Sequence, residues 1–414
     1  MADNIFGDVL LRDENAIPFN TLKRILERPV IHPRYRLSIL TPDEQVSYII
    51  PESDITLDGL NYTESYQNGQ RRSITVTLAN ENGQYTPNIN GIWINTRFGF
   101  DVGIQYQDTT IWFPKGVYIL GDVSLTRDDS NKTIQLQLSD KYAVFEGKTG
   151  TLETAYEVEL GSNIIDAVKG VLNFSLGNGY ILDYKEPIFD PSFIGLKTQQ
   201  TIRAEQGETL GSILDALATQ LSAEYYYNTV GNLCFYPINE TVDDSVKPVI
   251  WTYPKLSRDL HNMDLQYQNE QIINCVKVVG DSVDSTIYTA TVTNNNPSSP
   301  ICVERIGRRM DAPYTSSQVW SDDLAYDLAN YYLRKSSFVG VQFSVSVSFN
   351  PILTVNNLCE VEDEFLSLQR EKLLITSISY NSKDGKISLS CCNTSDLPTN
   401  TSEKESQGEK IRWY

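Results

Sequence analysis

The sequence predicts a mainly β fold with an α+β insertion: two similar β-barrel domains plus a smaller helix-containing domain. Three observations support this prediction. Short runs of alternating apolar and polar residues, separated by Gly, Asn, Asp and Pro, fill most of the chain. Strong helical periodicity is concentrated between residues 151 and 257. Finally, the hairpin-like segment Tyr118–Asp140 has a counterpart of similar pattern at Leu373–Asn393.

The length and composition predict several globular domains. A chain of 414 residues exceeds what one hydrophobic core usually serves, so two to four domains are expected. No stretch approaches the roughly 18–20 apolar residues that span a bilayer, and the start lacks a basic and apolar leader. We therefore expect no membrane segment and no conventional secretion. The six cysteines are scattered, several of them among strand-like apolar residues, which favours buried reduced thiols.

The first 150 residues are predicted to form an arm and a β domain. Residues 1–30 look like an N-terminal arm that contains the short helical piece FNTLKRILE. Residues 31–150 are predicted to form the first β-barrel domain, because closely spaced strands with turn signals are typical of a sandwich or small barrel. Its strand candidates are RLSIL, VSYII, ITVTLAN, FDVGIQY, TIWF, VYILGDVSL and TIQLQLSD.

Residues 151–257 are predicted to form a compact α+β domain. Two segments, SNIIDAVKGVLN and TLGSILDALATQL, place their apolar residues on one face with the 3.6-residue period of a core-facing helix. A hairpin is expected behind the second helix, where Tyr225–Tyr227, the turn NTVGN and the strand LCFYPI follow one another.

Residues 258–395 are predicted to form the second β-barrel domain, with an inserted helix at about 316–335. The segments NCVKVVGD, TIYTATVT and VQFSVSVSF are its clearest strand candidates. Acidic residues in the early turns of the helix and basic residues in its last turn complement the helix dipole. Residues 396–414 form a polar tail that is too poor in apolar residues to fold alone.

The two hairpin segments can be aligned residue by residue. Any two amphipathic hairpins look alike, so the alignment alone leaves both coincidence and domain duplication open. In the alignment, Val123 and Leu125 fall on Ile378 and Tyr380, and Ile134, Leu136 and Leu138 fall on Ile387, Leu389 and Cys391.

The net charge of −19 argues against binding of nucleic acid or of an anionic membrane by electrostatic attraction. It does not argue against a duplex that passes nearby, because an acidic wall repels phosphates and permits sliding. We therefore expect no sequence-specific nucleic-acid binding.

Signals for catalysis or metal binding are weak throughout. The two histidines, His32 and His261, lack the spacing of metal ligands on a helix, and no phosphate-binding or nucleophile-elbow motif occurs. The segment ANENGQY supplies only a fragment of a calcium loop. We expect no enzyme activity, no cofactor and no metal, although 53 acidic residues leave a pair of hydrolytic carboxylates open.

Two groups of residues are candidates for contacts with other molecules. In EVEDE, Glu360, Glu362 and Glu364 alternate along one face of a strand, as a solvated edge or as an acidic stripe lining a lumen. The candidate interface aromatics are Trp93 and Trp112 in the first β domain and Trp413 and Tyr414 at the end of the polar tail. Aromatic residues are enriched in protein interfaces but also fill β cores, so both interpretations stay open for Trp93 and Trp112.

Four segments follow one another in the first β region: ITLDGLNYTES, RRSITVTLANENGQYTP, IWINTRFGFDVGI and WFPKGVYILGDVSL. Their order resembles that of the opening of tailed-phage baseplate and tail-tip hub proteins. The helix GETLGSILDALATQL, the stretch Asn274–Gly280, the helix LAYDLANYYL and the stretch Asn350–Val361 continue the order; Asn356 and Asn357 stand where family members often have Gly and Asp. The family positions matched here are Leu78, Asn80, Gly83, Trp93, Arg97, Gly116, Tyr118 and Leu120.

The resemblance implies a non-enzymatic structural hub. Its expected form is a homotrimer that adapts a six-fold tail tube to a three-fold spike or fibre and leaves an acidic axial channel for DNA. Two similar barrels in each of three chains would present six around the axis. The expected partners are a tail tube protein and spike, fibre or other baseplate proteins. The expected location is the virion tail, assembled in the host bacterial cytoplasm. The alternatives are a carbohydrate-binding tip module and a tail-associated cell-wall hydrolase.

Overall fold

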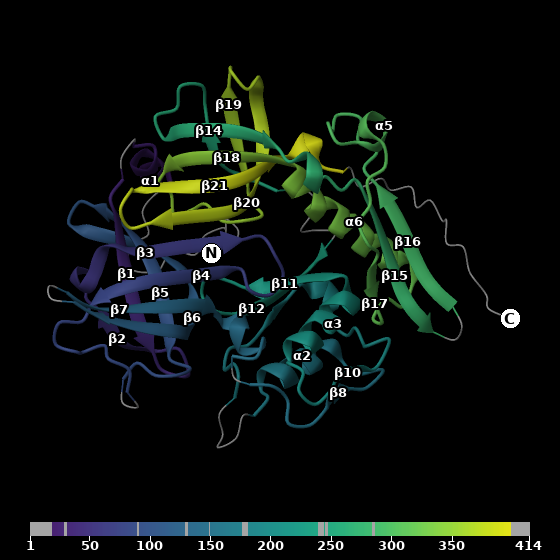
Figure 1. Cartoon of the computed structure of the whole chain (residues 1–414), viewed down its shortest axis with the longest axis horizontal. Coiled ribbons are helices and arrows are strands. Elements are labelled where there is room, and N and C mark those ends of the chain that lie inside the picture. Colours follow the sequence, from purple (N-terminus) through teal and green to yellow (C-terminus); the bar gives the residue numbers. More distant parts are fainter. Residues whose placement is uncertain are drawn as a thin grey trace.

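The structure is a computed structural model of the chain (Figure 1). It describes residues 19–28, 31–88, 91–128, 131–148, 150–175, 181–238, 244, 247–283 and 286–398. The chain is mainly β with an α+β insertion, as the sequence predicted. Among the described residues, no helix has the length and apolar character needed to cross a membrane. All six cysteines lie in the described ranges and are buried thiols.

The first β unit is an antiparallel sheet preceded by a short helix. Helix α1 (Phe19–Leu26) packs Leu22, Ile25 and Leu26 into the core of the sheet. Strand β4 illustrates why these residues form strands, because its alternation buries Ile74 and Val76 and leaves the residues between them half-buried. In spatial order the strands are β3 (Ile55–Ser65), β4 (Arg72–Ala79), β7 (Lys132–Asp140), β6 (Thr109–Arg127), β5 (Arg97–Tyr106), β1 (Pro33–Leu40) and β2 (Val46–Ile50).

The second β unit has a similar sheet. Strand β13 pairs in parallel with β19, so it belongs to this unit although it lies within the range predicted for the α+β domain. The strands in spatial order are β14 (Leu260–Tyr267), β18 (Val341–Ser348), β21 (Lys386–Asn393), β20 (Leu368–Asn381), β19 (Leu358–Asp363) and β13 (Val249–Tyr253).

The two β units share one continuous sheet. Strand β20 of the second unit pairs antiparallel with β3 of the first. Figure 1 shows β20 and β3 side by side, between β21 on one flank and β4 on the other. A single cluster of buried apolar side chains extends through both units. The edges that two separate barrels would each expose are therefore paired with one another at this joint.

The α+β unit lies between the two β units in sequence and has its own core. The two predicted helices are confirmed as α2 (Ile164–Leu172) and α3 (Gly211–Leu221). The predicted hairpin is confirmed as β11 (Ala223–Tyr227) and β12 (Leu233–Pro237), with β9 (Ile188–Phe189) parallel to β12. Strands β8 (Tyr156–Val158) and β10 (Ile202–Ala204) form a second small sheet.

A separate helical unit interrupts the second β unit between β14 and β18. The prediction that NCVKVVGD and TIYTATVT belong to the second barrel is wrong. As β15 (Cys275–Val283) and β16 (Thr286–Thr293) they pair with one another, and β15 also pairs with β17 (Tyr314–Ser316). The predicted helix is α6 (Asp322–Gly340), and it buries Leu324, Leu328 and Leu333 against this small sheet. The short helix α5 (Val303–Ile306) lies in the same insertion.

Candidate assembly interface

The same five-stranded arrangement occurs twice in the continuous sheet. In the first unit the spatial order is β3-β4-β7-β6-β5, and in the second it is β14-β18-β21-β20-β19. If the five strands of each arrangement are numbered in chain order, the first, second, fifth, fourth and third follow one another across the sheet in both units. The hairpin β6–β7 therefore has the topological position of β20–β21, which are the two segments that the sequence aligned.

The residue pairing is also the same in the two units. The match is in register, because the residues aligned from sequence occupy equivalent positions in the ladders. Strands β4 and β7 pair Ile74 with Leu138, Val76 with Leu136 and Leu78 with Ile134, while strands β18 and β21 pair Phe343 with Cys391, Val345 with Leu389 and Val347 with Ile387.

Each hairpin carries a β-bulge at the same place. On β6 the pairing with β7 shifts between Leu120 and Val123, and on β20 the pairing with β21 shifts between Ile375 and Ser377. In both hairpins one extra residue stands on the first strand. A bulge kinks and twists a ladder at a defined point, and a chance similarity of two amphipathic hairpins does not reproduce it. Domain duplication therefore explains the repeated hairpin better than coincidence.

The joint between the two units buries aromatic side chains. Residues Ser377–Asn381 of β20 pair with Asn61–Ser65 of β3. Tyr380 stacks on Tyr62 with ring centroids 4.6 Å apart, and both side chains are buried. Aromatic cross-strand pairs of this kind stabilise a sheet beyond the area that they bury.

A buried ion pair lies at this joint. Arg72 donates from Nε and Nη2 to Glu64 Oε1, at 3.0 and 2.8 Å, and also donates to the Tyr227 carbonyl of the α+β unit at 2.7 Å. Burial works to raise the pKa of the Glu64 carboxyl, but Arg72 and Lys115 outweigh it and hold that pKa below its usual value. Glu64 is therefore an anion that depends on its cationic neighbours.

Two strand edges of the repeated arrangement lack the partner that the joint provides. The end of β6 beyond Gly121 pairs with β7 alone, and β14 pairs with β18 alone, within the part of the chain that the structure describes. By register, Val123 and Leu125 correspond to Ile378 and Tyr380 of the joint. Leu125 is 53% exposed, whereas Tyr380 is 7% exposed. On β14, Tyr267 is 58% exposed.

One face of the continuous sheet carries mainly hydroxyl and amide side chains. These side chains are half-buried or exposed, and their alternation with core residues runs across the joint from one unit into the other. Charged groups such as Asp264 and Lys386 are a minority on this polar face. Its members include Asn61, Thr63, Ser73, Thr75, Thr77, Ser124, Gln135, Gln137, Asn262, Gln266, Ser344, Ser346, Ser379, Ser388 and Ser390.

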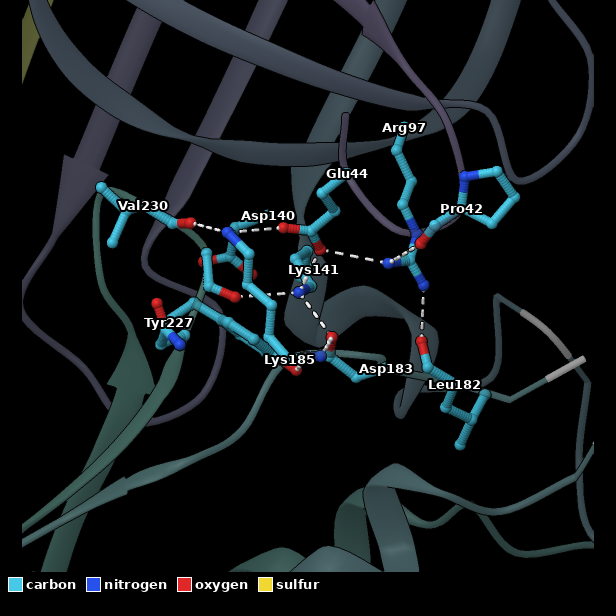
Figure 2. A network of polar contacts seen from close by, with 12 residues as sticks. Pro42, Glu44, Arg97, Asp140, Lys141, Leu182, Asp183, Lys185, Tyr227 and Val230 are labelled. Carbon is cyan, nitrogen blue, oxygen red and sulfur yellow. Dashed lines mark hydrogen bonds and ion pairs between the residues drawn. The ribbon is translucent and has the colours of Figure 1, made fainter. Parts of the chain in front are cut away.

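A buried polar network joins the first β unit to the α+β unit (Figure 2). Glu44, in the turn between β1 and β2, contacts three cations. Its carboxylate lies 3.1 Å from Arg97 Nη1 and 2.8 Å from Lys185 Nζ, and it also pairs with Lys141. Lys141 reaches Asp183 at 2.7 Å, and Arg97 donates to the Leu182 carbonyl at 2.7 Å.

The centre of this network is shielded from solvent, whereas Lys185 at its rim is 31% exposed. The side chains of Glu44 and Lys141 are 2% and 1% exposed. Burial lowers the pKa of the Lys141 ammonium, although Asp183 and Glu44 oppose the shift. Buried charges are tolerated when they are paired and hydrogen-bonded, so the network fixes the α+β unit on the first β unit rather than forming an open site.

A second polar cluster connects the α+β unit to helix α6. Arg71 lies 2.7 Å from Glu224, and its guanidinium stacks on Tyr226 at 3.5 Å from the ring centroid. Lys335 of α6 approaches the same Glu224 at 3.9 Å, and burial lowers the pKa of its ammonium to about 8. Polar contacts thus join the α+β unit and the helical insertion, whose apolar cores are separate.

The sequence did not identify these buried charges as important. The adjacent arginines of RRSITVTL and the DKY of QLQLSDKY stand at the ends of predicted strands, where charged residues are ordinarily solvated. Only their positions in the folded chain distinguish these buried charges from solvated ones.

The acidic residues that the sequence singled out are paired with cations. Glu362 lies 2.8 Å and Glu360 4.0 Å from Arg370, and Glu364 lies 2.6 Å from Lys255. Glu360 and Glu362 are on β19, whereas Glu364 follows the end of that strand. Their charge is therefore partly offset.

The candidate aromatics differ in their surroundings. Trp93 is 44% exposed and lines a cleft with Tyr48 and Ile94, whereas Trp112 is half-buried beneath the guanidinium of Arg36, 4.4 Å from the ring centroid. The other two predicted residues, Trp413 and Tyr414, lie outside the described residues.

His261, considered above for catalysis, forms a hydrogen bond with Ser348 at 3.0 Å. In the described ranges, no group of three or more potential metal ligands is found.

Comparison with known proteins identifies the fold. No protein-family model matches the chain, and no curated protein sequence matches it significantly. Solved structures do. A 43 kDa tail protein of prophage MuSo2 from Shewanella oneidensis is similar with a TM-score of 0.57 and 17% identity, over 88% of this chain and 99% of that one.

Two further structures extend the comparison. A tail protein from Neisseria meningitidis has a TM-score of 0.55 and 13% identity, over 88% of this chain and 99% of that one. A PdpA-VgrG complex from Francisella has a TM-score of 0.50 and 12% identity, over 93% of this chain and 56% of that one. The resemblance predicted from the order of the segments is thereby confirmed at the level of structure: this chain has the fold of phage tail proteins.

Proposed function

We propose that the protein is a structural, non-enzymatic hub of a phage tail baseplate or tail tip. In this role three copies form a trimer that adapts a six-fold tail tube to a three-fold spike, fibre or other baseplate protein. The protein would be located in the virion tail and assembled in the host cytoplasm. The observation that carries the proposal is the repeated five-stranded arrangement, which gives each chain two topologically equivalent units.

The repetition supplies the symmetry that such an adaptor requires. Within the chain the units are related head to tail, because β20, the fourth of the five strands in the second unit, pairs with β3, the first of the five in the first unit. Head-to-tail contacts generate rings when the rotation closes. Three chains with two units each would form a ring that is three-fold in sequence and approximately six-fold in shape.

We further propose that the ring encloses an axial channel for DNA and that the polar face lines it. The apolar side of the sheet packs against the hydrophobic core. The core and the strands around it would therefore lie on the outer side of the ring. Hydroxyl and amide groups with few cations offer little attraction to phosphates, and the chain's net charge of −19 opposes DNA binding at longer range. The candidate stripe Glu360, Glu362 and Glu364 would contribute little, since Arg370 and Lys255 offset it.

Added positive charge on the polar face should make the channel retain DNA. We expect Q135K/Q137K/S388K to bind a short linear duplex at least about tenfold more tightly than the unmodified protein at about 0.15 M salt, with affinity that falls as salt rises. The measurement is fluorescence anisotropy of the labelled duplex. The matched control, T151K/Q199K/T201K, adds the same charge at exposed positions of the α+β region. Equal binding by both variants would contradict the assignment of the channel face.

The mass of the purified protein tests the proposed hub directly. Light scattering behind size-exclusion chromatography is expected to give three times the chain mass of 46.8 kDa. A monomer that binds glycans through the cleft of Tyr48, Trp93 and Ile94 would instead support the carbohydrate-binding alternative. A chain that cleaves peptidoglycan would support the hydrolase.

A further inference from the structure

We infer that the end of β6 in one copy pairs antiparallel with β14 of the next copy, in a register that the joint within the chain defines. The inference rests on the proposed trimer and specifies how its copies meet. It follows from the two edges that, in the described ranges, have no intramolecular counterpart of the β20–β3 pairing. The partner is therefore a second copy of this chain.

The two edges have the same positions in their units as the two strands of the joint. Strand β6 corresponds to β20, and β14 corresponds to β3. Even the hydrogen bonds that precede the joint recur, because Leu120 donates to the Thr96 carbonyl as Ile375 donates to the Asn357 carbonyl, both at 3.0 Å. Beyond this point β20 continues onto β3, whereas β6 has β7 as its single neighbour among the strands that the structure describes.

Because the two units have equivalent registers, the residue pairs at the joint predict the residue pairs between copies. In the joint, Tyr380 stands opposite Tyr62 and Ile378 opposite Glu64. Strand β14 pairs with β18 as β3 pairs with β4, which places Leu265 where Tyr62 stands. The predicted pairs between copies are Asp122 with Gln268, Val123 with Tyr267, Ser124 with Gln266, Leu125 with Leu265 and Thr126 with Asp264.

The side chains in these pairs are complementary. Val123 and Leu125 would meet Tyr267 and Leu265 on the core side, and only polar residues would meet on the opposite side. A shift by one residue would place the apolar set against the polar one. The pairing would also cover Leu125 and Tyr267, the exposed apolar residues of the two edges, and satisfy backbone groups that an open edge leaves to solvent.

The edges also have the polarity that closes a ring. Each copy presents a β6 edge from its first unit and a β14 edge from its second, so the contact is head to tail. It repeats the relation that already exists between the two units of one chain. The polar face then continues from copy to copy without interruption.

A pair of cysteines tests the register. In the joint, Tyr66 N donates to the Thr376 carbonyl and Ser382 N to the Leu60 carbonyl, which makes Thr63 and Ser379 a non-hydrogen-bonded pair with closely spaced Cα atoms. The corresponding pair between copies is Ser124 with Gln266. Mild oxidation of S124C/Q266C should give covalent trimers on a non-reducing gel, with at least half of the chains linked.

The chain provides its own controls. T63C/S379C places the same pair inside one chain, so it should form an intramolecular disulfide and remain monomeric on the gel. S124C/D264C moves one cysteine by two residues on the same face and should link at least tenfold less.

The outcomes separate the inference from the proposed function. A trimer by mass in which S124C/Q266C stays unlinked, or links no better than S124C/D264C, overturns the inferred register and leaves the trimeric hub intact. A particle that is monomeric at every concentration overturns both.

Discussion

R72M is expected to destabilise the protein by about 3–5 kcal/mol at pH 7, because it leaves Glu64 buried without its main cationic partner. Glu64 is 1% exposed, and its other hydrogen bonds come from the neutral hydroxyls of Tyr62 and Thr354, at 3.1 and 3.2 Å. Those donors do not replace a guanidinium. The free energy of unfolding in urea, followed by tryptophan fluorescence, measures the loss.

The loss caused by R72M should shrink as the pH is lowered. In the unmodified protein the pKa of Glu64 is depressed, so its stabilising contribution is present above the unfolded pKa and disappears as the pH falls through the folded pKa. In the variant, burial without Arg72 raises the pKa of Glu64 above the unfolded value. The folded variant then takes up a proton more readily than the unfolded chain. The difference in the free energy of unfolding between R72M and the unmodified protein therefore becomes smaller from pH 7 towards pH 4.

Two variants serve as controls for R72M. E64Q/R72M removes the buried charge together with its partner and should recover a large part of the stability. R370M removes an arginine whose side chain is 72% exposed although it also pairs with a glutamate at 2.8 Å, and it should leave the free energy of unfolding nearly unchanged, because solvent screens exposed ion pairs. Equal losses for R72M and R370M would contradict the role given to the joint.

E44A is the second variant with a large expected effect, again about 3–5 kcal/mol. Removal of this carboxylate leaves Arg97, Lys141 and Lys185 close together, and among the described residues Asp183 is then the one remaining ion-pair partner of Lys141. The loss should become smaller in alkaline solution, because the pKa of Lys141 is already depressed and a neutral lysine needs no anion. Urea unfolding at pH 7 and pH 9.5 measures both effects.

The position of Glu44 predicts which part of the molecule responds. Since the network joins the first β unit to the α+β unit, amide hydrogen exchange in E44A should accelerate around residues 141–144 and 181–185 before it accelerates in β4. The matched control is E364A, whose side chain is 79% exposed and pairs with Lys255 at 2.6 Å. It should change the free energy of unfolding by less than about 1 kcal/mol. An E44A variant as stable as E364A would refute the structural role of the network.

Much of the fold could be predicted because it depends on local pattern. The alternation in β4 and β18 and the helical period of α2 and α3 identify those elements from a few residues each. The repeated hairpin was also visible, since Ile134, Leu136 and Leu138 match Ile387, Leu389 and Cys391 in pattern. The equivalent strand registers and the β-bulges at equivalent positions in the structure support a domain duplication.

The remaining features depend on contacts between distant residues. Strands β15 and β16 alternate in the same way as barrel strands, and only their pairing with each other separates them from the second β unit. The fusion of the two units through β20 and β3 leaves no sequence signal, because an edge strand and a joint strand share one pattern. The candidate site also depends on contacts between distant residues. In the sequence Glu360 and Glu362 form an acidic stripe, and only the structure shows that Arg370 lies beside them.

The most direct test of the account is a cryo-electron microscopy reconstruction of the purified protein at a resolution that separates strands. The account predicts a ring of three copies with six similar β units around an axial channel, in which β6 of each copy continues onto β14 of the next. A ring with another number of copies, or three copies that meet through surfaces other than these two edges, would contradict it.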